Sequence, residues 1–259
     1  MVDKDSIKKA LQIESWKSLF ENGSSKKSDV SSSSSTKKDV SELSLSSQSK
    51  TLSELTSRAR ILAYDVVTYL DSQFTERQDR LNLSARDLEN TKRELLNKGQ
   101  VKEVWIGKSL FLAPTTELYH LLGVDCPYRR NIWDVHSFLV LLAAKLVGSN
   151  PLIKHVDCEV PVSDSGSTID LVAYLKDGRR WAYEVVHRSI TNVAANAAKL
   201  QGKGFSQVIF LAVDFNTKEA TWASIRNTGF APDFAATIRC VIFSTLIRQK
   251  KQLRLREIQ

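Results

Sequence analysis

The sequence predicts an α/β protein with an N-terminal disordered tail, a small helical domain and a larger domain built on a mixed sheet flanked by helices. Three observations predict it. Residues 24–49 are dominated by Ser and Lys. Residues 52–122 alternate helical periodicity with turn residues and end in two short strand-like runs. Residues 131–259 read helix, three strands, helix, strand, helix, strand, an order that favours a sheet covered by helices.

The composition sets the class of protein. The chain has 259 residues, 42% of them hydrophobic, and a formal net charge of +8, which favours an anionic partner such as nucleic acid. No apolar run approaches the roughly 18 residues that span a bilayer, and the N-terminus lacks an apolar signal core. Three widely spaced cysteines, Cys126, Cys158 and Cys240, argue against a disulfide framework. We therefore expect a cytoplasmic protein without a membrane partner.

The first 50 residues form the predicted tail. Its Ser/Lys-rich part, 24–49, has too few large apolar side chains to offset the entropy of ordering. Before it, apolar residues recur at helical spacing within 5–21, which predicts a short amphipathic helix. Docking of this helix onto a protein partner and packing against the chain's own core are both open.

The helical domain, 51–123, begins with a predicted helix over 52–74 and a second from Thr75. A tight turn at 82–84 follows, with Ser84 as the N-cap of a helix that reaches residue 97. Gly99 supplies the left-handed C-cap conformation. Two strands, 101–106 and 110–112, then form a hairpin.

This order of elements resembles a winged helix-turn-helix. The residues that carry the resemblance are Leu81, Leu83, Ser84, Leu88, Leu95, Lys98, Gly99 and Val101. The resemblance implies that helix 84–97 enters the major groove of duplex DNA, presenting Arg86, Lys92 and Arg93, while Lys108 of the wing contacts phosphate. Use of the same fold only for protein packing is the alternative.

The larger domain, 131–259, contains the acidic pair on which the functional prediction depends. Its predicted elements are a helix at 131–147, strands at 155–162, 168–175 and 181–187, a helix at 192–200, a strand at 208–213, a helix at 217–227 and a strand at 238–246. Asp170 opens the second strand and Glu184 lies in the third, among apolar neighbours. An acid in such a strand often marks a site.

The hairpin loop decides whether the two acids share a face. A two-residue loop would pair Asp170 with Val185 and turn Glu184 to the other face of the sheet. A three-residue loop, 177–179, pairs Asp170 with Val186 and places Glu184 on the same face as Asp170. A metal site therefore predicts an odd loop or a strand bulge.

The element order with Asp170 and Glu184 in these positions resembles the PD-(D/E)XK nuclease superfamily, and in particular small domains that follow a winged helix and accompany DNA-pumping ATPases of mobile elements. The resemblance covers about 115 residues and implies a restriction-endonuclease-like sheet. It implies that Asp170 and Glu184 bind Mg²⁺ (or Mn²⁺), which polarises the phosphate and activates water.

The chain departs from this family pattern at Val186, where the family has a lysine. His187 or Arg188 could substitute, or Lys199 from the following helix, since the family sometimes relocates the lysine. Asn192 and Asn196 of that helix either contact the site or lie on the surface. His136 and Asp134 at the start of helix 131–147 are weaker candidates, for which backbone bonding and the helix dipole are the alternative explanations.

Two functions follow from these patterns. The first is a metal-dependent DNA endonuclease of a mobile element or defence system, with Asp170, Glu184, His187, Lys199 and His136 as candidate catalytic residues. The second is a catalytically inactive nuclease-fold adaptor or transcriptional regulator that binds DNA. Double-stranded DNA is the expected partner in both, with an ATPase expected at residues 5–21 and a second copy of the chain, in a homodimer, as a further candidate.

Overall fold

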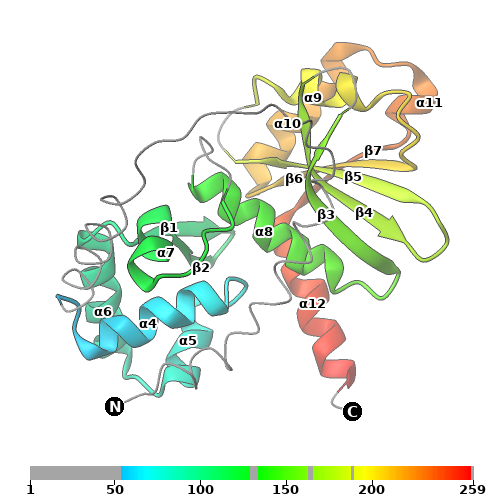
Figure 1. The fold of residues 1–259 in the computed structure, drawn as a ribbon. Helices are drawn as coiled ribbons and strands as arrows, with labels where there is room; N and C mark the ends of the chain where they lie inside the picture. Colours follow the sequence, from blue (N-terminus) through cyan, green and yellow to red (C-terminus); the bar gives the residue numbers. More distant parts are fainter. Residues whose placement is uncertain (1–53, 129–133, 163–165, 188–189, 258–259) are drawn as a thin grey trace, which may run out of the picture. The chain divides into compact units, whose positions relative to one another are not determined.

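The computed structural model describes residues 54–128, 134–162, 166–187 and 190–257. The predicted tail, with its helix at 5–21, lies outside the described residues. The described chain divides into two compact units: a helical unit formed by residues up to Val104 with Leu110–Phe138, and a sheet unit formed by Trp105–Ser109 with residues from Leu139 onward. The predicted α/β class, with helices followed by a mixed sheet, is confirmed (Figure 1).

The helical unit contains most of the elements that the sequence predicts. They are α4 Ser57–Thr68, α5 Phe74–Leu81, α6 Ala85–Asn97, β1 Val101–Ile106, β2 Ser109–Pro114 and α7 Thr116–Leu122, with the β1–β2 turn and the strand residues next to it counted in the sheet unit. Ser84 is the predicted N-cap, and its hydroxyl accepts a hydrogen bond from the amide of Asp87 at 3.1 Å. Asn82, between α5 and α6, adopts the left-handed conformation that asparagine tolerates in tight turns. Gly99 follows α6 with φ +67°, as predicted.

One prediction for this unit is wrong, and one helix was not predicted. The first helix does not continue to residue 74, because α4 ends at Thr68 and a separate helix, α5, begins at Phe74. Helix α7 was not expected. Thr115 caps it by accepting from the amide of Leu118, and Gly123 ends it in the left-handed conformation, a start and stop pattern that the sequence displays. The core of the unit lies between α4, α6 and α7 and includes Leu62, Leu88, Leu95 and Leu118.

The sheet unit has a five-stranded sheet with helices on its faces. Its elements are α8 Asp134–Gly148 (shared with the helical unit), β3 Ile153–Pro161, β4 Thr168–Leu175, β5 Arg180–Val186, α9 Val193–Leu200, β6 Gln207–Ala212, α10 Phe215–Thr228, α11 Pro232–Ala235, β7 Ile238–Ile242 and α12 Phe243–Glu257. The strand order is β3-β4-β5-β6-β7. The pairs β3–β4 and β4–β5 are antiparallel, and the pairs β5–β6 and β6–β7 are parallel.

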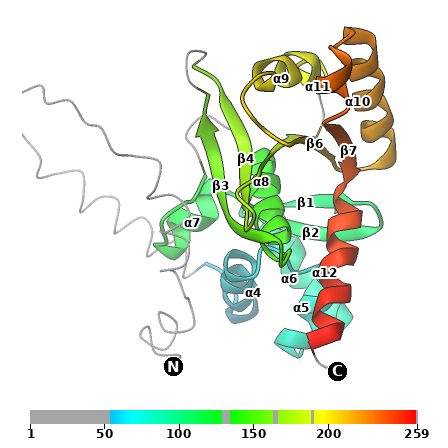
Figure 2. The same cartoon turned by 90° about the vertical axis from the view of Figure 1, so that its right-hand side faces the viewer.

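The sheet is covered on both faces. Helices α9 and α10 pack against β5, β6 and β7 on one face, and α8 lies on the other (Figures 1 and 2). Between α9, α10 and the sheet lies a core that includes Ala182, Val186, Val193, Phe210 and further side chains of the same kind. Strand β6 lies between two parallel neighbours, β5 and β7, which explains its unbroken apolar sequence.

The predicted strand at 238–246 is wrong in its second half. The strand ends at Ile242, and α12 begins at Phe243. The spacing of Phe243, Leu246 and Leu253 is helical, so the apolar run spans a strand and the first turns of a helix. Within the described residues, no helix is both long enough and apolar enough to cross a membrane.

Candidate functional site

Asp170 and Glu184 lie side by side on the face of the sheet that α9 covers. Strands β4 and β5 pair with Leu171 opposite Tyr183, so continuing this register by one residue sets Asp170 opposite Glu184. Opposite residues of an antiparallel pair point to the same face, with Cβ atoms about 5 Å apart. The two carboxylates therefore share one side of the sheet.

The hairpin loop that produces this register is short and tightly turned. The amide of Leu175 donates to the carbonyl of Arg179 at 2.9 Å, and the amide of Gly178 donates to the carbonyl of Leu175 at 3.1 Å. Gly178 has φ +86°, the left-handed region that favours glycine. Three residues, 176–178, thus separate the paired positions. The predicted shared face is correct, but the predicted pairing of Asp170 with Val186 is wrong.

Asp170 is anchored to the neighbouring strand. Its Oδ2 accepts a hydrogen bond from the amide of Val185 at 2.7 Å, and its side chain is half-buried. This bond fixes the carboxylate at the start of β4 beside the end of β5. A carboxylate held by a backbone amide keeps its orientation without the cost of ordering a flexible partner.

Glu184 is almost completely buried, with 2% of its surface exposed. Its Oε2 accepts a hydrogen bond from the Nδ2 of Asn196 at 3.0 Å, and its Oε1 lies 2.9 Å from the Nζ of Lys199. Burial, together with the negative charge of Asp170, raises the pKa of Glu184 to about 8, and Lys199 opposes this shift. Close to neutral pH, Glu184 is thus poised between its protonated and charged forms.

Lys199 supplies a cation near Glu184, where position 186 of the strand offers none. Val186, at the predicted lysine position, is buried in the core under α9. Helix α9 packs Val193, Ala197 and Leu200 inward, which brings Asn196 and Lys199 over β5. The Nζ of Lys199 donates to the carbonyl of Thr168 at 2.5 Å in addition to its ion pair with Glu184. The sequence-based candidate Lys199 therefore joins the acid pair.

The acid pair has a donor set that suits magnesium better than zinc. The Oε1 of Glu184 is buried, and the Nζ of Lys199 lies 2.9 Å from it. Among the described residues, no group of three or more His, Cys, Asp and Glu side chains has the geometry to hold a metal ion. Zinc sites in proteins need three or four such ligands, whereas Mg²⁺ is usually held by one or two carboxylates, waters and substrate phosphates.

The other candidate catalytic residues occupy less central positions. His187 directly follows β5, which ends at Val186, and is half-buried. His136 lies in the first turn of α8, within the helical unit. Asp134 in the same turn pairs with Lys102 at 3.1 Å and accepts from the hydroxyl of Thr116 at 2.9 Å, which gives it a structural task.

The candidate DNA-binding residues of α6 divide into two groups. Arg86 and Arg93 are exposed and form no ion pair with any described residue, and Lys108 is exposed at the β1–β2 turn. Asn90 and Asn97 are exposed as well. The spacing of positions 86, 90, 93 and 97 places them on one face of the helix. The two asparagines were not predicted, although their helical spacing from Arg86 is visible in the sequence.

Lys92 is placed differently. It is buried, and its Nζ lies 2.6 Å from Glu103 and 3.0 Å from Glu89, above the ring of Phe74. These contacts tie α6 to β1 and neutralise the ammonium. Such a placement does not suit a contact with DNA phosphate, and we leave Lys92 out of the proposed interface.

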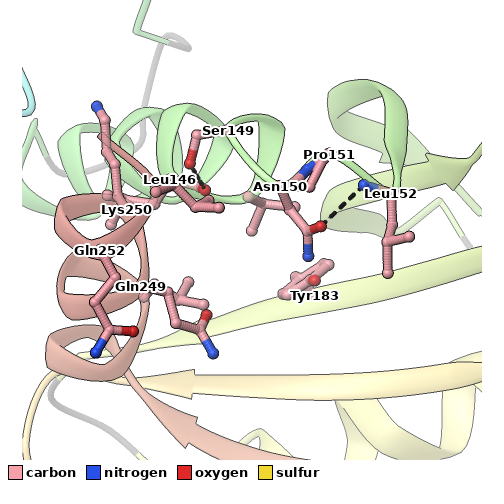
Figure 3. Close-up of a pocket in the computed structure, with 12 residues that line it drawn as sticks. Leu146, Ser149, Asn150, Pro151, Leu152, Tyr183, Gln249, Lys250 and Gln252 are labelled. Carbon is pink, nitrogen blue, oxygen red and sulfur yellow. Dashed lines mark hydrogen bonds between the residues drawn. The ribbon is translucent and has the colours of Figure 1, made fainter. Parts of the chain in front are cut away.

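A pocket of about 300 Å³ lies between the end of α8, β5 and α12. The amide side chains of Asn150 and Gln249 point into it beside Tyr183 (Figure 3). Tyr183 neighbours Glu184 on β5, and successive strand residues point to opposite faces. The pocket is thus separated from the acid pair by the sheet, and we assign it no part in the candidate site.

Comparison with known proteins adds no relative: no protein-family model, no curated protein and no solved structure matches the chain significantly.

Proposed function

We propose that the protein is a metal-dependent DNA endonuclease whose site is formed by Asp170, Glu184 and Lys199. The observation that carries this proposal is the 2.9 Å contact between Lys199 and Glu184, together with the placement of Asp170 opposite Glu184. Two acids and an amine on one face of a sheet constitute the chemical groups of a PD-(D/E)XK site. Here the amine comes from α9, whereas the family pattern takes it from the strand.

Each side chain has a task in phosphodiester cleavage. Mg²⁺ or Mn²⁺, when bound by Asp170 and Glu184, would polarise the phosphate and lower the pKa of an attacking water. Glu184 releases its proton to become a ligand, while Asn196 holds its other oxygen in place. The ammonium of Lys199 stabilises negative charge that develops on the phosphate oxygens.

DNA would be delivered by the helical unit, which we propose to be a winged helix-turn-helix. The exposed face of α6 offers Arg86, Asn90, Arg93 and Asn97. Arginine recognises guanine and asparagine recognises adenine through paired hydrogen bonds in the major groove. Lys108 at the hairpin turn would contact phosphate. A nuclease domain joined to such a reader fits a mobile element or a defence system, as the sequence resemblance implies.

One observation favours the alternative, an inactive nuclease-fold adaptor or regulator that binds DNA without cutting it. Glu184 is buried and already compensated by Lys199, and the described residues include no third acidic or histidine ligand beside the acid pair. An inactive relative would retain these groups as a buried polar cluster that holds α9 on the sheet.

Cleavage of supercoiled plasmid in Mg²⁺ or Mn²⁺ tests the proposal. We expect nicking by the parent and its loss in Asp170→Asn and Glu184→Gln. The matched control is Glu219→Gln, which changes an exposed acid of α10 in the same unit and should cut like the parent. Salt-sensitive DNA binding without cleavage by the parent would support the adaptor instead, and equal cleavage by all variants would refute the site.

A further inference from the structure

A row of aromatic and cationic side chains crosses three strands on the same face as the acid pair. His155 of β3 pairs with Tyr174 of β4, and Tyr174 pairs with Arg180 of β5. Directly opposite residues point to one face of a sheet. Strands β3, β4 and β5 run side by side in that order (Figure 1), so the row runs from the edge of the sheet inward.

The rings in this row are stacked. His155 and Tyr174 lie with ring centroids 4.2 Å apart and planes 11° apart. The His155 side chain is 46% exposed, and β3 is the edge strand. Asp157 lies beside both rings, 4.0 Å from the Nε2 of His155 and hydrogen-bonded to Tyr174. The arrangement is a preformed aromatic stack at the open edge of the sheet.

Arg180 is held in place at the inner end of the row. Its guanidinium donates to the carbonyl of Lys203 at 3.0 Å and lies 5.0 Å from the centre of the Phe205 ring. A Cβ at Gly204, which has φ +73°, would stand 3.2 Å from the same guanidinium, so glycine leaves room for it. Arg180 forms no ion pair with any described acid, which leaves its charge available to an anion.

The row and the acid pair lie at a fixed spacing along β4. Tyr174 is four residues from Asp170 and points to the same face, about 13 Å away at ~3.3 Å per residue. An extended single strand of nucleic acid covers such a distance in a few nucleotides. Stacked bases with a cation for the phosphate are the chemistry by which proteins bind single strands without sequence preference.

We propose that His155, Tyr174 and Arg180 form a subsite for single-stranded DNA, which binds the strand beside the phosphate to be cut. A base stacks on the exposed ring of His155, and Arg180 contacts the phosphate backbone. The substrate class is then DNA with a single-stranded segment, such as a flap, a branch or an unwound end. The proposal rests on the proposed nuclease function, but the binding itself requires no cleavage.

Fluorescence anisotropy tests the subsite with a labelled oligodeoxythymidine of about 16 nucleotides, within the range that single-strand-binding folds occupy. A hairpin duplex of similar length serves as the second probe. EDTA is present throughout, so that no probe is cut. We expect His155→Ala and Tyr174→Leu to weaken oligodeoxythymidine binding at least about fivefold, since one stacked base contributes ~1 kcal/mol or more. Duplex binding should stay unchanged.

Conservative variants separate stacking from folding. Tyr174→Phe and His155→Phe keep the rings and should bind oligodeoxythymidine within about twofold of the parent. Arg180→Gln should weaken binding, whereas Arg226→Gln, an exposed arginine of α10, should not. Thermal unfolding of each variant shows that the comparison is between folded proteins.

Three results would overturn the subsite: no binding of oligodeoxythymidine by the parent, unchanged binding in folded His155→Ala and Tyr174→Leu, or an equal loss of duplex and single-strand binding. Failure of the subsite is distinguishable from failure of the nuclease. If Glu184→Gln loses plasmid cleavage, but His155→Ala and Tyr174→Leu bind oligodeoxythymidine like the parent, the nuclease alone would be retained. If the parent cuts no DNA, but His155→Ala and Tyr174→Leu still weaken single-strand binding, the subsite alone would be retained.

Discussion

The two units each contain a buried charge cluster, and the two clusters are opposite in their balance. In the helical unit, Asp65 is shared by two arginines, Arg77 and Arg80. In the sheet unit, Glu184 pairs with Lys199 and experiences the charge of a second acid, Asp170. One cluster therefore has a surplus of positive charge and the other a surplus of negative charge.

Both clusters are held together by several hydrogen bonds and ion pairs. Arg77 donates to Asp65 and to the carbonyls of Tyr69 and Ser72, and Arg80 reaches both oxygens of Asp65 and the hydroxyl of Ser72. Arg80 also stacks on Tyr69 at 4.2 Å. In the sheet unit, the Oε2 of Glu184 accepts from Asn196 and its Oε1 pairs with Lys199. The clusters therefore differ in the sign of their surplus charge, and the surplus negative charge of the sheet unit is the one that suits a cation.

The largest expected effect is on the stability of the helical unit. Asp65→Ala leaves Arg77 buried without its carboxylate, and removal of one partner from a buried pair costs about 3–5 kcal/mol. Urea denaturation of the variant should show this loss. Glu184→Gln is the counterpart, and it should cost far less because the protonated acid and the amide are alike in shape and charge. Equal losses in both variants would refute the distinction between the clusters.

The next effect concerns catalysis. Lys199→Met removes the ammonium beside Glu184 and should lower plasmid cleavage about 10²–10³-fold, the usual consequence of removing one charge-stabilising donor. Lys92→Met is the matched control, since Lys92 is likewise buried and paired with two glutamates, Glu89 and Glu103. The cleavage rate of Lys92→Met should equal that of the parent when both rates are divided by the concentration of folded protein. Retained activity in Lys199→Met would exclude Lys199 from the site.

The contrast between these lysines shows what the sequence could and could not predict. The acids Asp170 and Glu184 and the order of elements followed from strand and helix patterns, whereas Lys199 was one of three cations, with His187 and Arg188, that the resemblance suggested in place of the family lysine. The burial of Lys92 could also have been predicted, because Lys92 lies four residues after Leu88 and three before Leu95, both core positions of α6. The residue that pairs with Asp170 across the hairpin could not be predicted, because the sequence around Gly178 allows hairpin loops of several lengths.

The stacked row was harder to predict for the same reason. His155 follows a register shift at the start of β3, and a shift of one residue would turn its ring to the other face. Periodicity identifies each strand but does not say which residues of different strands lie opposite. The residues that lie opposite one another on neighbouring strands can therefore be identified only when the loop geometry is known.

A smaller effect should appear in the dependence of stability on pH. The pKa of Glu184 is about 8 in the folded protein and near 4.5 when it is free of its surroundings. Between these values the unfolded chain loses its proton while the folded chain retains it, so stability falls as pH rises from about 4.5 to 8. Glu184→Gln should remove this part of the slope, as thermal unfolding across that range would show.

Magnesium should reduce the loss of stability that accompanies rising pH. A bound cation favours the carboxylate form of Glu184, so Mg²⁺ should raise the melting temperature more at pH 8 than at pH 6. The difference should be absent in Glu184→Gln. A magnesium effect that is equal at both pH values, or one that persists in the variant, would show that the cation binds elsewhere.

The smallest effect distinguishes two neighbouring residues of α6. Arg93 is exposed and Lys92 is buried between Glu89 and Glu103, so only Arg93 can release counterions when it meets DNA phosphate. Arg93→Gln should weaken duplex binding several-fold and reduce the slope of log affinity against log salt by about 1. Lys92→Gln should leave that slope unchanged even if it lowers stability, because its charge never reaches the duplex. A slope reduced by Lys92→Gln and not by Arg93→Gln would mean that DNA meets a different face of the helix, and the exposed Arg86, Asn90 and Asn97 would then lose their place in the proposed interface.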